Sequence, residues 1–271
     1  MLRYRKPKIG LALGGGSAKG LSHIGVIKIL VASNIPIDFI AGTSIGALIG
    51  GSYAAIGDIN KIEEIALRTN WREILPLLDP SIFRGLLSGD KLKKFIKLHT
   101  ENKTFDDLKI PFTAVATDLA TGDPVYLNSG SVSDAIRASV SLPLVFKPVK
   151  YKDKLLTDGG LSVPVPVSIL KEMGAEIIIA VNLLTHYSSE KLMTGLGLFR
   201  IANDTISILN HHLANNNIKE ANVVVRPLVS EIGWKNILTR EGTIEVIKAG
   251  EVAMTEKMEE LNGIFSKKIF W

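Results

Sequence analysis

The stretch Gly42-Thr43-Ser44-Ile45-Gly46 decides how the rest of this sequence is interpreted. An apolar run, Ile35 to Ala41, leads into it, and apolar residues at helical spacing follow it as far as Ile56. A strand, a G-x-S-x-G turn and a helix together form the context of a nucleophile elbow, in which the serine projects from the edge of a sheet. Ser44 would lie at a helix N-terminus, where backbone N–H groups stabilise negative charge. The alternative is an ordinary helix start capped by Thr43 or Ser44.

A second glycine-rich stretch precedes this elbow. Gly14-Gly15-Gly16-Ser17-Ala18-Lys19-Gly20 lies between a predicted strand, Lys8 to Leu13, and a predicted helix, Ala18 to Ala32. The Rossmann and P-loop patterns each fail here by one residue, so nucleotide binding is the weaker interpretation. Consecutive glycine N–H groups beside a helix N-terminus favour an oxyanion hole at Gly14, Gly15 and Gly16 over a simple tight turn.

The order of the predicted elements indicates an α/β fold. Strand, helix and strand within the first 43 residues form a βαβ unit with parallel strands, whose carboxyl ends share one edge of the sheet. The glycine loop and Ser44 should therefore meet there. The remaining pattern alternates strands and helices without a repeat or linker, so we predict one three-layer α/β/α domain over residues 1–271 with a mainly parallel sheet. Further strands are expected at 111–118, 124–127, 149–151, 154–157, 177–183 and 222–226, and helices at 45–56, 59–70, 71–78, 91–100, 131–140, 166–173, 194–217 and 239–261.

The composition limits the chemistry and the partners. The absence of cysteine excludes disulfides, thiolate zinc sites and cysteine nucleophiles. A net charge of +5 suits an anionic partner, either lipid or nucleic acid, without demonstrating one. Of these two partners we expect the lipid and no nucleic acid. The apolar run Ile9 to Leu13 is too short for a signal peptide, and no run approaches the roughly 18 apolar residues of a spanning helix. We therefore expect a cytoplasmic protein, with peripheral membrane contact through the tail 267–271 as an open alternative.

A nucleophilic serine needs a base, and five histidines are available. Only His186, just after the strand predicted at 177–183, fits the Ser…Asp…His order of an α/β-hydrolase. That fold places several strands before its nucleophile, whereas 41 residues precede Gly42. The other four are expected within helices, those of the 194–217 helix facing solvent: His23, His99, His211 and His212.

Two aspartates are the alternative bases. Asp158 is followed by Gly159 and Gly160, which allow a sharp turn and leave its carboxylate uncovered on one side. Asp118, at the end of a predicted strand, competes with it, although capping or turn formation is the simpler account of that residue.

These motifs resemble the bacterial patatin-like phospholipases. The resemblance rests on the 14–20 loop, the 42–46 elbow and Asp158-Gly159-Gly160. Two further stretches, 116–122 and 137–143, also resemble blocks of the family, and the resemblance covers about residues 9–183. It implies a serine esterase with a Ser44–Asp158 dyad, an oxyanion hole at Gly14 to Gly16, and no metal or cofactor. The supporting residues are Ser17, Lys19 (where the family often has arginine), Gly42, Gly46, Gly159 and Gly160.

The expected reaction is hydrolysis of a phospholipid or other acyl lipid, of the phospholipase A or lysophospholipase type, through an acyl-enzyme at Ser44. The alternatives are a Ser-Asp-His esterase or thioesterase, a nucleotide-binding protein that uses the glycine loop, and a catalytically silent lipid-binding module. The sequence specifies neither headgroup, acyl position nor chain length.

Overall fold

The computed structural model describes residues 6–71, 89–185, 198–229 and 239–269. Its centre is a mixed, mainly parallel sheet in the order β5-β6-β3-β2-β1-β7-β8, with β4 also paired to β3. The parallel strands are β1 (Ile9–Leu13), β2 (Phe39–Thr43), β3 (Phe112–Asp118), β7 (Ile177–Val181) and β8 (Val223–Val225). The antiparallel strands are β4 (Pro124–Leu127), β5 (Val149–Tyr151) and β6 (Lys154–Asp158).

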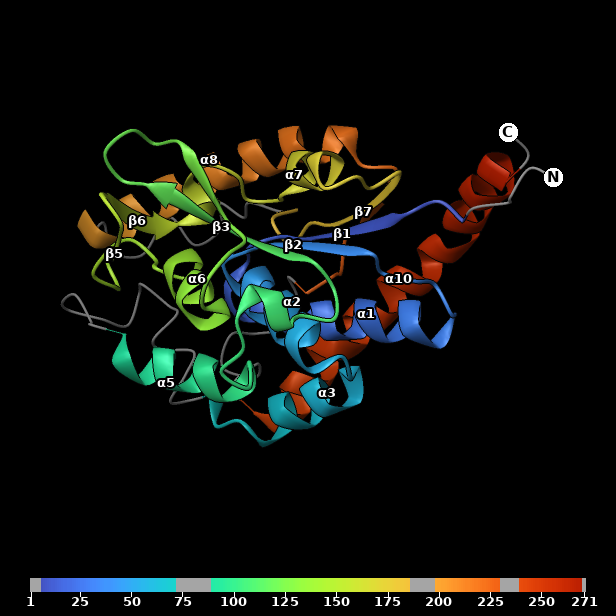
Figure 1. Cartoon of the computed structure of the whole chain (residues 1–271), viewed down its shortest axis with the longest axis horizontal. Coiled ribbons are helices and arrows are strands. Elements are labelled where there is room, and N and C mark those ends of the chain that lie inside the picture. Colours follow the sequence, from blue (N-terminus) through green and yellow to red (C-terminus); the bar gives the residue numbers. More distant parts are fainter. Residues whose placement is uncertain (1–5, 72–88, 186–197, 230–238, 270–271) are drawn as a thin grey trace.

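Helices cover both faces of this sheet, which confirms the predicted three-layer α/β fold (Figure 1). One face carries α7 (Val167–Glu172) and α8 (Leu198–Asn217). The other carries α1 (Ser22–Ala32), α2 (Ile45–Ile56), α3 (Ile59–Arg68), α5 (Asp90–His99), α6 (Val132–Ser139) and α10 (Arg240–Ile269). Short 3-10 helices are η1 (Ser17–Leu21), η4 (Phe105–Asp107), η5 (Gly159–Leu161) and η7 (Ile218–Glu220).

The two apolar layers follow from the period-two alternation of the strands. In β1, the side chains of Ile9, Leu11 and Leu13 enter the larger core with α1 and α2, whereas Ala12 enters the smaller core with α7. All five β1 residues are buried, as expected of a central parallel strand covered by helices on both faces.

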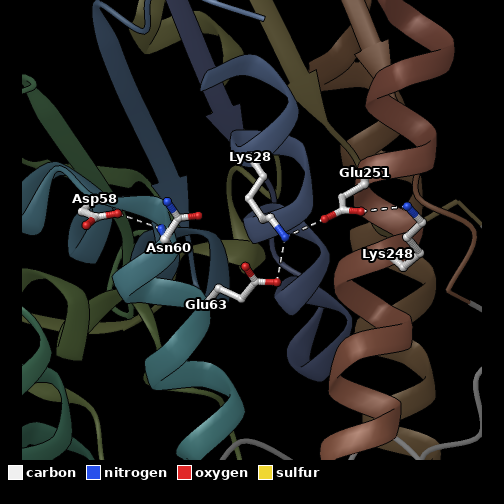
Figure 2. Close-up of polar contacts among 6 residues, drawn as sticks. All are labelled: Lys28, Asp58, Asn60, Glu63, Lys248 and Glu251. Atoms are coloured by element: carbon white, nitrogen blue, oxygen red, sulfur yellow. Dashed lines mark hydrogen bonds and ion pairs between the residues drawn. The ribbon is translucent and has the colours of Figure 1, made fainter. Parts of the chain in front are cut away.

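The C-terminal helix α10 packs directly on α1. A Cβ at Gly250 would collide with the carbonyl oxygen of Ser22, so the two backbones approach more closely there than any side chain allows. Figure 2 shows Lys28 of α1 held between Glu251 of α10, at 2.7 Å, and Glu63 of α3, at 2.8 Å. Residues after the predicted motifs thus take part in the same packing as the first helix.

The pairing of β3 brings two distant segments end to end. β2 pairs with residues 112–115 of β3, and β6 pairs with residues 116–118. Because β4 pairs with residues 114–117 and so overlaps both, it occupies the opposite edge of β3, and β2 and β6 share the remaining edge. Thr43, the last residue of β2, lies opposite Val115, and Asp158, the last residue of β6, lies opposite Ala116. The two strands therefore meet head to head at Ser44 and Asp158.

Candidate active site

Ser44 lies on a strained turn between β2 and α2. Its backbone angles, φ 55° and ψ −122°, are rare for a residue with a side chain, and such strain is typical of a nucleophile elbow. Its N–H donates to the Ser139 hydroxyl at 2.9 Å, and that hydroxyl donates to the Val115 carbonyl at 2.6 Å. Gly46 is required because a Cβ there would collide with the Leu13 carbonyl, and a Cβ at Gly42 would meet the Gly46 carbonyl at 2.5 Å.

The glycine loop after β1 lies beside Ser44, as the βαβ argument predicted. A Cβ on Gly15 would be 3.6 Å from the Ser44 Cβ. The N–H of Gly14 donates to the Val181 carbonyl at 3.1 Å, and that of Gly15 donates to the Pro164 carbonyl at 3.0 Å. These two groups, expected as oxyanion donors, instead hold the loop in place. Within the described part of the chain, the Gly16 N–H donates to no other protein group.

Asp158 is fixed by contacts on both its backbone and its side chain. Its N–H donates to the Ser141 carbonyl at 2.9 Å, and its own carbonyl accepts from the Thr117 hydroxyl at 2.9 Å. The carboxylate Oδ1 accepts the Gly160 N–H at 2.8 Å. The second oxygen, Oδ2, is buried and has no hydrogen-bond partner among the described residues.

Burial of the Asp158 carboxylate raises its pKa to about 6, against the lowering effects of the Ser44 hydroxyl and the Gly160 N–H. Ser44 is therefore close enough to stabilise the carboxylate, although the unpartnered Oδ2 shows that no well-aligned hydrogen bond joins them. Such bonds are often long in unliganded sites and tighten when substrate binds.

Ser44 and Asp158 open into one cavity of about 290 Å³. Gly15, Gly16, Ser17, Lys19 and Gly160 also line it, so most of the predicted site residues gather there. Its roof comes from α8, where Asn210 has a buried Oδ1 with no hydrogen-bond partner. The apolar part of the wall consists of Leu142, Pro164, Leu184 and Ile206.

The competing carboxylate, Asp118, is in a different electrostatic state. Its Oδ2 pairs with Lys154 Nζ at 2.8 Å and its Oδ1 accepts the Ala120 N–H at 3.1 Å. The hydrogen bond from Lys154, with that from Ala120, lowers the pKa of Asp118. Asp118 is thus an ionised carboxylate whose charge is balanced by Lys154. Its bond from the Ala120 N–H agrees with the turn interpretation of this residue, which did not foresee the ion pair.

No histidine of the described residues hydrogen-bonds to Ser44 or Asp158. His23 Nε2 donates to the Gly14 carbonyl at 2.8 Å, and burial lowers its pKa to about 4, so this ring is neutral and supports the glycine loop. His211, expected to face solvent, is half-buried and its Nδ1 contacts the Leu184 carbonyl at 2.6 Å. His99 contacts the Phe95 carbonyl at 2.7 Å. His186 lies outside the described residues.

Comparison of the sequence with models of known protein families identifies the family of this chain. Residues 11–171 match the family model described as patatin-like phospholipase. The chain belongs to the patatin-like phospholipase family. The matched span includes the glycine loop, Ser44 and Asp158 in that order.

The sequence similarity to curated relatives covers about two thirds of this patatin-like chain. An uncharacterized NTE family protein of Mycobacterium tuberculosis is 40% identical over 178 residues, which are 65% of this chain and 49% of that protein. The lysophospholipase nte1 of Emericella nidulans is 34% identical over 180 residues, 64% of this chain and 12% of that protein. The chain thus spans at most about half the length of these relatives, and the similarity covers only part of each.

Solved structures support the fold over nearly the whole chain. VipD from Legionella pneumophila matches with a TM-score of 0.53 at 14% identity, covering 96% of this chain and 67% of that one. The type III effector protein ExoU matches with a TM-score of 0.52 at 12% identity, covering 94% and 53%. The matched region therefore extends well past Leu183, where the recognisable motifs end.

Several residues of this site were not predicted from the sequence. Ser139, His23 and Asn210 act through contacts that only the folded chain creates: an acceptor for the Ser44 N–H, a donor to the glycine loop, and a polar atom in the cavity roof. Ser139 lies in one of the stretches that resemble the family, which was the available signal. His23 and Asn210 lie in helices whose apolar periodicity gave no indication of their roles.

Proposed function

We propose that this patatin-like chain is a lipid acyl hydrolase in which Ser44 is the nucleophile and Asp158 the general base. The observation that carries the proposal is the head-to-head meeting of β2 and β6, which leaves a strained serine beside a buried carboxylate with a free oxygen. Phospholipid or lysophospholipid esters are the expected substrates, since the family is named for phospholipases and one relative for lysophospholipase activity.

Acylation would begin when Asp158 accepts the Ser44 hydroxyl proton on Oδ2. The Ser44 oxygen forms a bond to the ester carbonyl carbon, and the carbonyl electron pair moves onto its oxygen. Collapse of this tetrahedral species breaks the bond to the leaving alcohol, which takes the proton from Asp158. Water then attacks the carbonyl carbon of the acyl-enzyme while Asp158 accepts one of its protons. Collapse of this second tetrahedral species breaks the bond between the Ser44 oxygen and the acyl carbon, the Ser44 oxygen takes the proton back from Asp158, and the fatty acid leaves.

Two features of the site suit the negative charge that develops on the carbonyl oxygen. The first turn of α2 begins directly after Ser44 and directs backbone N–H groups toward the elbow. Within the loop, the Gly16 N–H is the donor that we assign to the oxyanion hole, since Gly14 and Gly15 would first have to release Val181 and Pro164. The polar end of the cavity is thereby assigned to the ester, and the apolar residues Leu142, Leu184 and Ile206 to an acyl chain.

A carboxylate base requires its pKa to lie below the working pH. With a pKa of about 6, Asp158 is mostly ionised at neutral pH and yet far more basic than an ordinary aspartate. We expect kcat/KM for a soluble ester to fall as pH drops through about 6, whereas an unperturbed aspartate would keep it constant down to roughly pH 4.

Fluorophosphonate labelling followed by mass spectrometry tests the assignment directly. The adduct should lie on Ser44, and Ser44→Ala should remove it. Asp158→Asn should lose most turnover and retain its fold, and His186→Ala should keep turnover within a small factor of the wild type. An adduct elsewhere would refute the nucleophile assignment, and an inactive, folded His186→Ala protein would replace the dyad with a triad.

A further inference from the structure

A second cavity, of about 640 Å³, lies apart from Ser44 between α5, α6 and the β5–β6 hairpin. Its size is within the range of small-molecule sites, roughly 300–1,000 Å³. None of the residues that line the Ser44 cavity lines this one. The catalytic chemistry proposed above therefore leaves it without a role.

The charges around this cavity are unbalanced. Its two acids are compensated, since Asp134 pairs with Lys93 at 2.7 Å and Asp90 faces the buried guanidinium of Arg137. Three further cations line the cavity and form no ion pair with any described residue: Lys147, Lys150 and Lys152. The neighbouring acid Asp153 occupies the hairpin turn and is not among the residues that line the cavity. An anion would offset this local excess of about three positive charges.

Exposed leucines lie beside these lysines. Leu155 of β6 is 44% exposed and Leu119, just after β3, is 51% exposed. The two are adjacent, because the Leu119 N–H donates to the Leu155 carbonyl at 2.8 Å. Leu144, in the segment that leads to Lys147, is 37% exposed. Lysines next to exposed aliphatic side chains are typical of a peripheral lipid-binding surface. In a nucleic-acid site the lysines would bind phosphates, but the exposed leucines would bind nothing.

The strand register places this surface on the same side as the candidate active site. Asp158 is level with the end of β2, and the preceding residues of β6 run outward past Asp118, the last residue of β3. The hairpin turn at 152–153 therefore projects beyond the edge at which Ser44 lies. Figure 1 shows β5 and β6 at one end of the molecule and the end of α10 at the other.

We propose that the basic cavity binds the phosphate-bearing headgroup of an anionic lipid, and that it and the exposed leucines dock this edge of the protein on an anionic bilayer. The inference rests on the proposed function for its meaning, since it specifies that the ester is met at a lipid surface. The binding itself is independent of Ser44, so failure of docking and failure of catalysis are separate results.

The test is co-sedimentation of the full chain carrying Ser44→Ala with phosphatidylcholine vesicles, with and without phosphatidylserine. Each lysine near an anionic surface contributes about fivefold to partitioning. The triple variant Lys147→Gln/Lys150→Gln/Lys152→Gln should therefore bind phosphatidylserine vesicles about a hundredfold more weakly. Leu119→Asn/Leu155→Asn should also weaken binding, whereas Leu98→Asn/Val252→Asn, which changes exposed apolar residues on α5 and α10, should not.

A matched variant separates this cavity from net charge alone. Lys171→Gln/Lys248→Gln/Lys257→Gln removes the same charge from α7 and α10 and should keep most of the binding. Equal losses in the two triple variants would overturn the proposal. Binding of the Ser44→Ala chain, with all its lysines in place, that does not depend on phosphatidylserine would also overturn it. Lysine-dependent retention of a DNA oligonucleotide without vesicle binding would assign the cavity to nucleic acid instead. Circular dichroism of each variant verifies that it is folded.

Discussion

Replacing the candidate base should stabilise the protein while it removes activity. Asp158 has a pKa of about 6 in the folded chain and about 3.8 when unfolded, so its ionised form is less favourable in the folded state. This difference corresponds to about 3 kcal/mol of lost stability at pH 8. Asparagine has nearly the same shape, cannot ionise, and can still accept the Gly160 N–H. Asp158→Asn should therefore raise the free energy of unfolding by up to about 3 kcal/mol at pH 8.

The stability gained by Asp158→Asn should decrease as the pH falls. Protonation of Asp158 as pH falls through about 6 removes the penalty from the wild type, and below about pH 4 the unfolded chain is protonated as well. The advantage of Asp158→Asn should thus be about half its full size near pH 5 and vanish near pH 3.5. Urea unfolding at pH 8, 5 and 3.5, followed by circular dichroism, measures it.

Asp118→Asn is the matched control with the opposite expectation. Lys154 lowers the pKa of Asp118, so the ionised form is favoured in the folded state, and removing it should reduce stability at neutral pH. If Asp158→Asn destabilised the protein at pH 8 as Asp118→Asn does, the carboxylate at 158 would be stabilised by its surroundings. The reasoning that makes it an effective base would then be wrong.

Three further expectations concern packing and the chain terminus. Ser139→Ala removes the acceptor of the Ser44 N–H and should cost roughly 1–3 kcal/mol and slow phosphonate labelling, whereas Ser133→Ala on the same helix should leave labelling unchanged. Gly250→Ala should destabilise by roughly 1–3 kcal/mol because its Cβ meets the Ser22 carbonyl, while Gly263→Ala, with open space around it, should stabilise by roughly 0.5–1 kcal/mol in urea unfolding. Deleting residues 267–271 should leave vesicle binding intact. A loss of binding as large as that of Lys147→Gln/Lys150→Gln/Lys152→Gln would favour the tail as the membrane anchor.

The fold was largely predictable because glycines and apolar periodicity act locally. The βαβ unit followed from the first 43 residues, and the right-handed crossover then placed the glycine loop and Ser44 at one edge. Boundaries were less accurate. The strand before the elbow covers Phe39–Thr43 instead of Ile35 to Ala41, because Pro36 has no N–H and the Ile35 N–H caps the end of α1 through the Leu30 carbonyl.

Some predictions failed where a residue's neighbours come from distant parts of the chain. The spacing of Leu21, Ile24, Ile27 and Val31 along the predicted 18–32 helix places Val31 on its inward face. In the structure Val31 is 42% exposed, and Leu30 is the buried residue at the end of α1. The predicted helix at 18–32 begins with the 3-10 turn η1, which accommodates the close approach of Gly20 to Ile45. Apolar spacing along one helix cannot reveal which of its residues other elements will cover.

The candidate site was also predictable only in part from the sequence. Ser44 and Asp158 were identifiable because each carries a local glycine signature. The sequence could not identify which glycine N–H groups are free to bind an oxyanion. In the structure the N–H groups of Gly14 and Gly15 donate to the carbonyls of Val181 and Pro164. The opposite pKa shifts of Asp158 and Asp118 also depend on tertiary contacts, namely burial in one case and Lys154 in the other.

The shared edge of β3 makes Ser44 a reporter of folding kinetics. Ser44 and Asp158 come together only after β2 and β6 have each found their own half of β3, and both pairings join segments remote along the chain. Such non-local pairings form late because loop-closure entropy opposes them. During refolding, reactivity toward a phosphonate should therefore appear after the helical circular dichroism signal. The delay between the helical signal and the phosphonate reactivity would measure how long the pairing of β2 and β6 with β3 takes after the helices have formed.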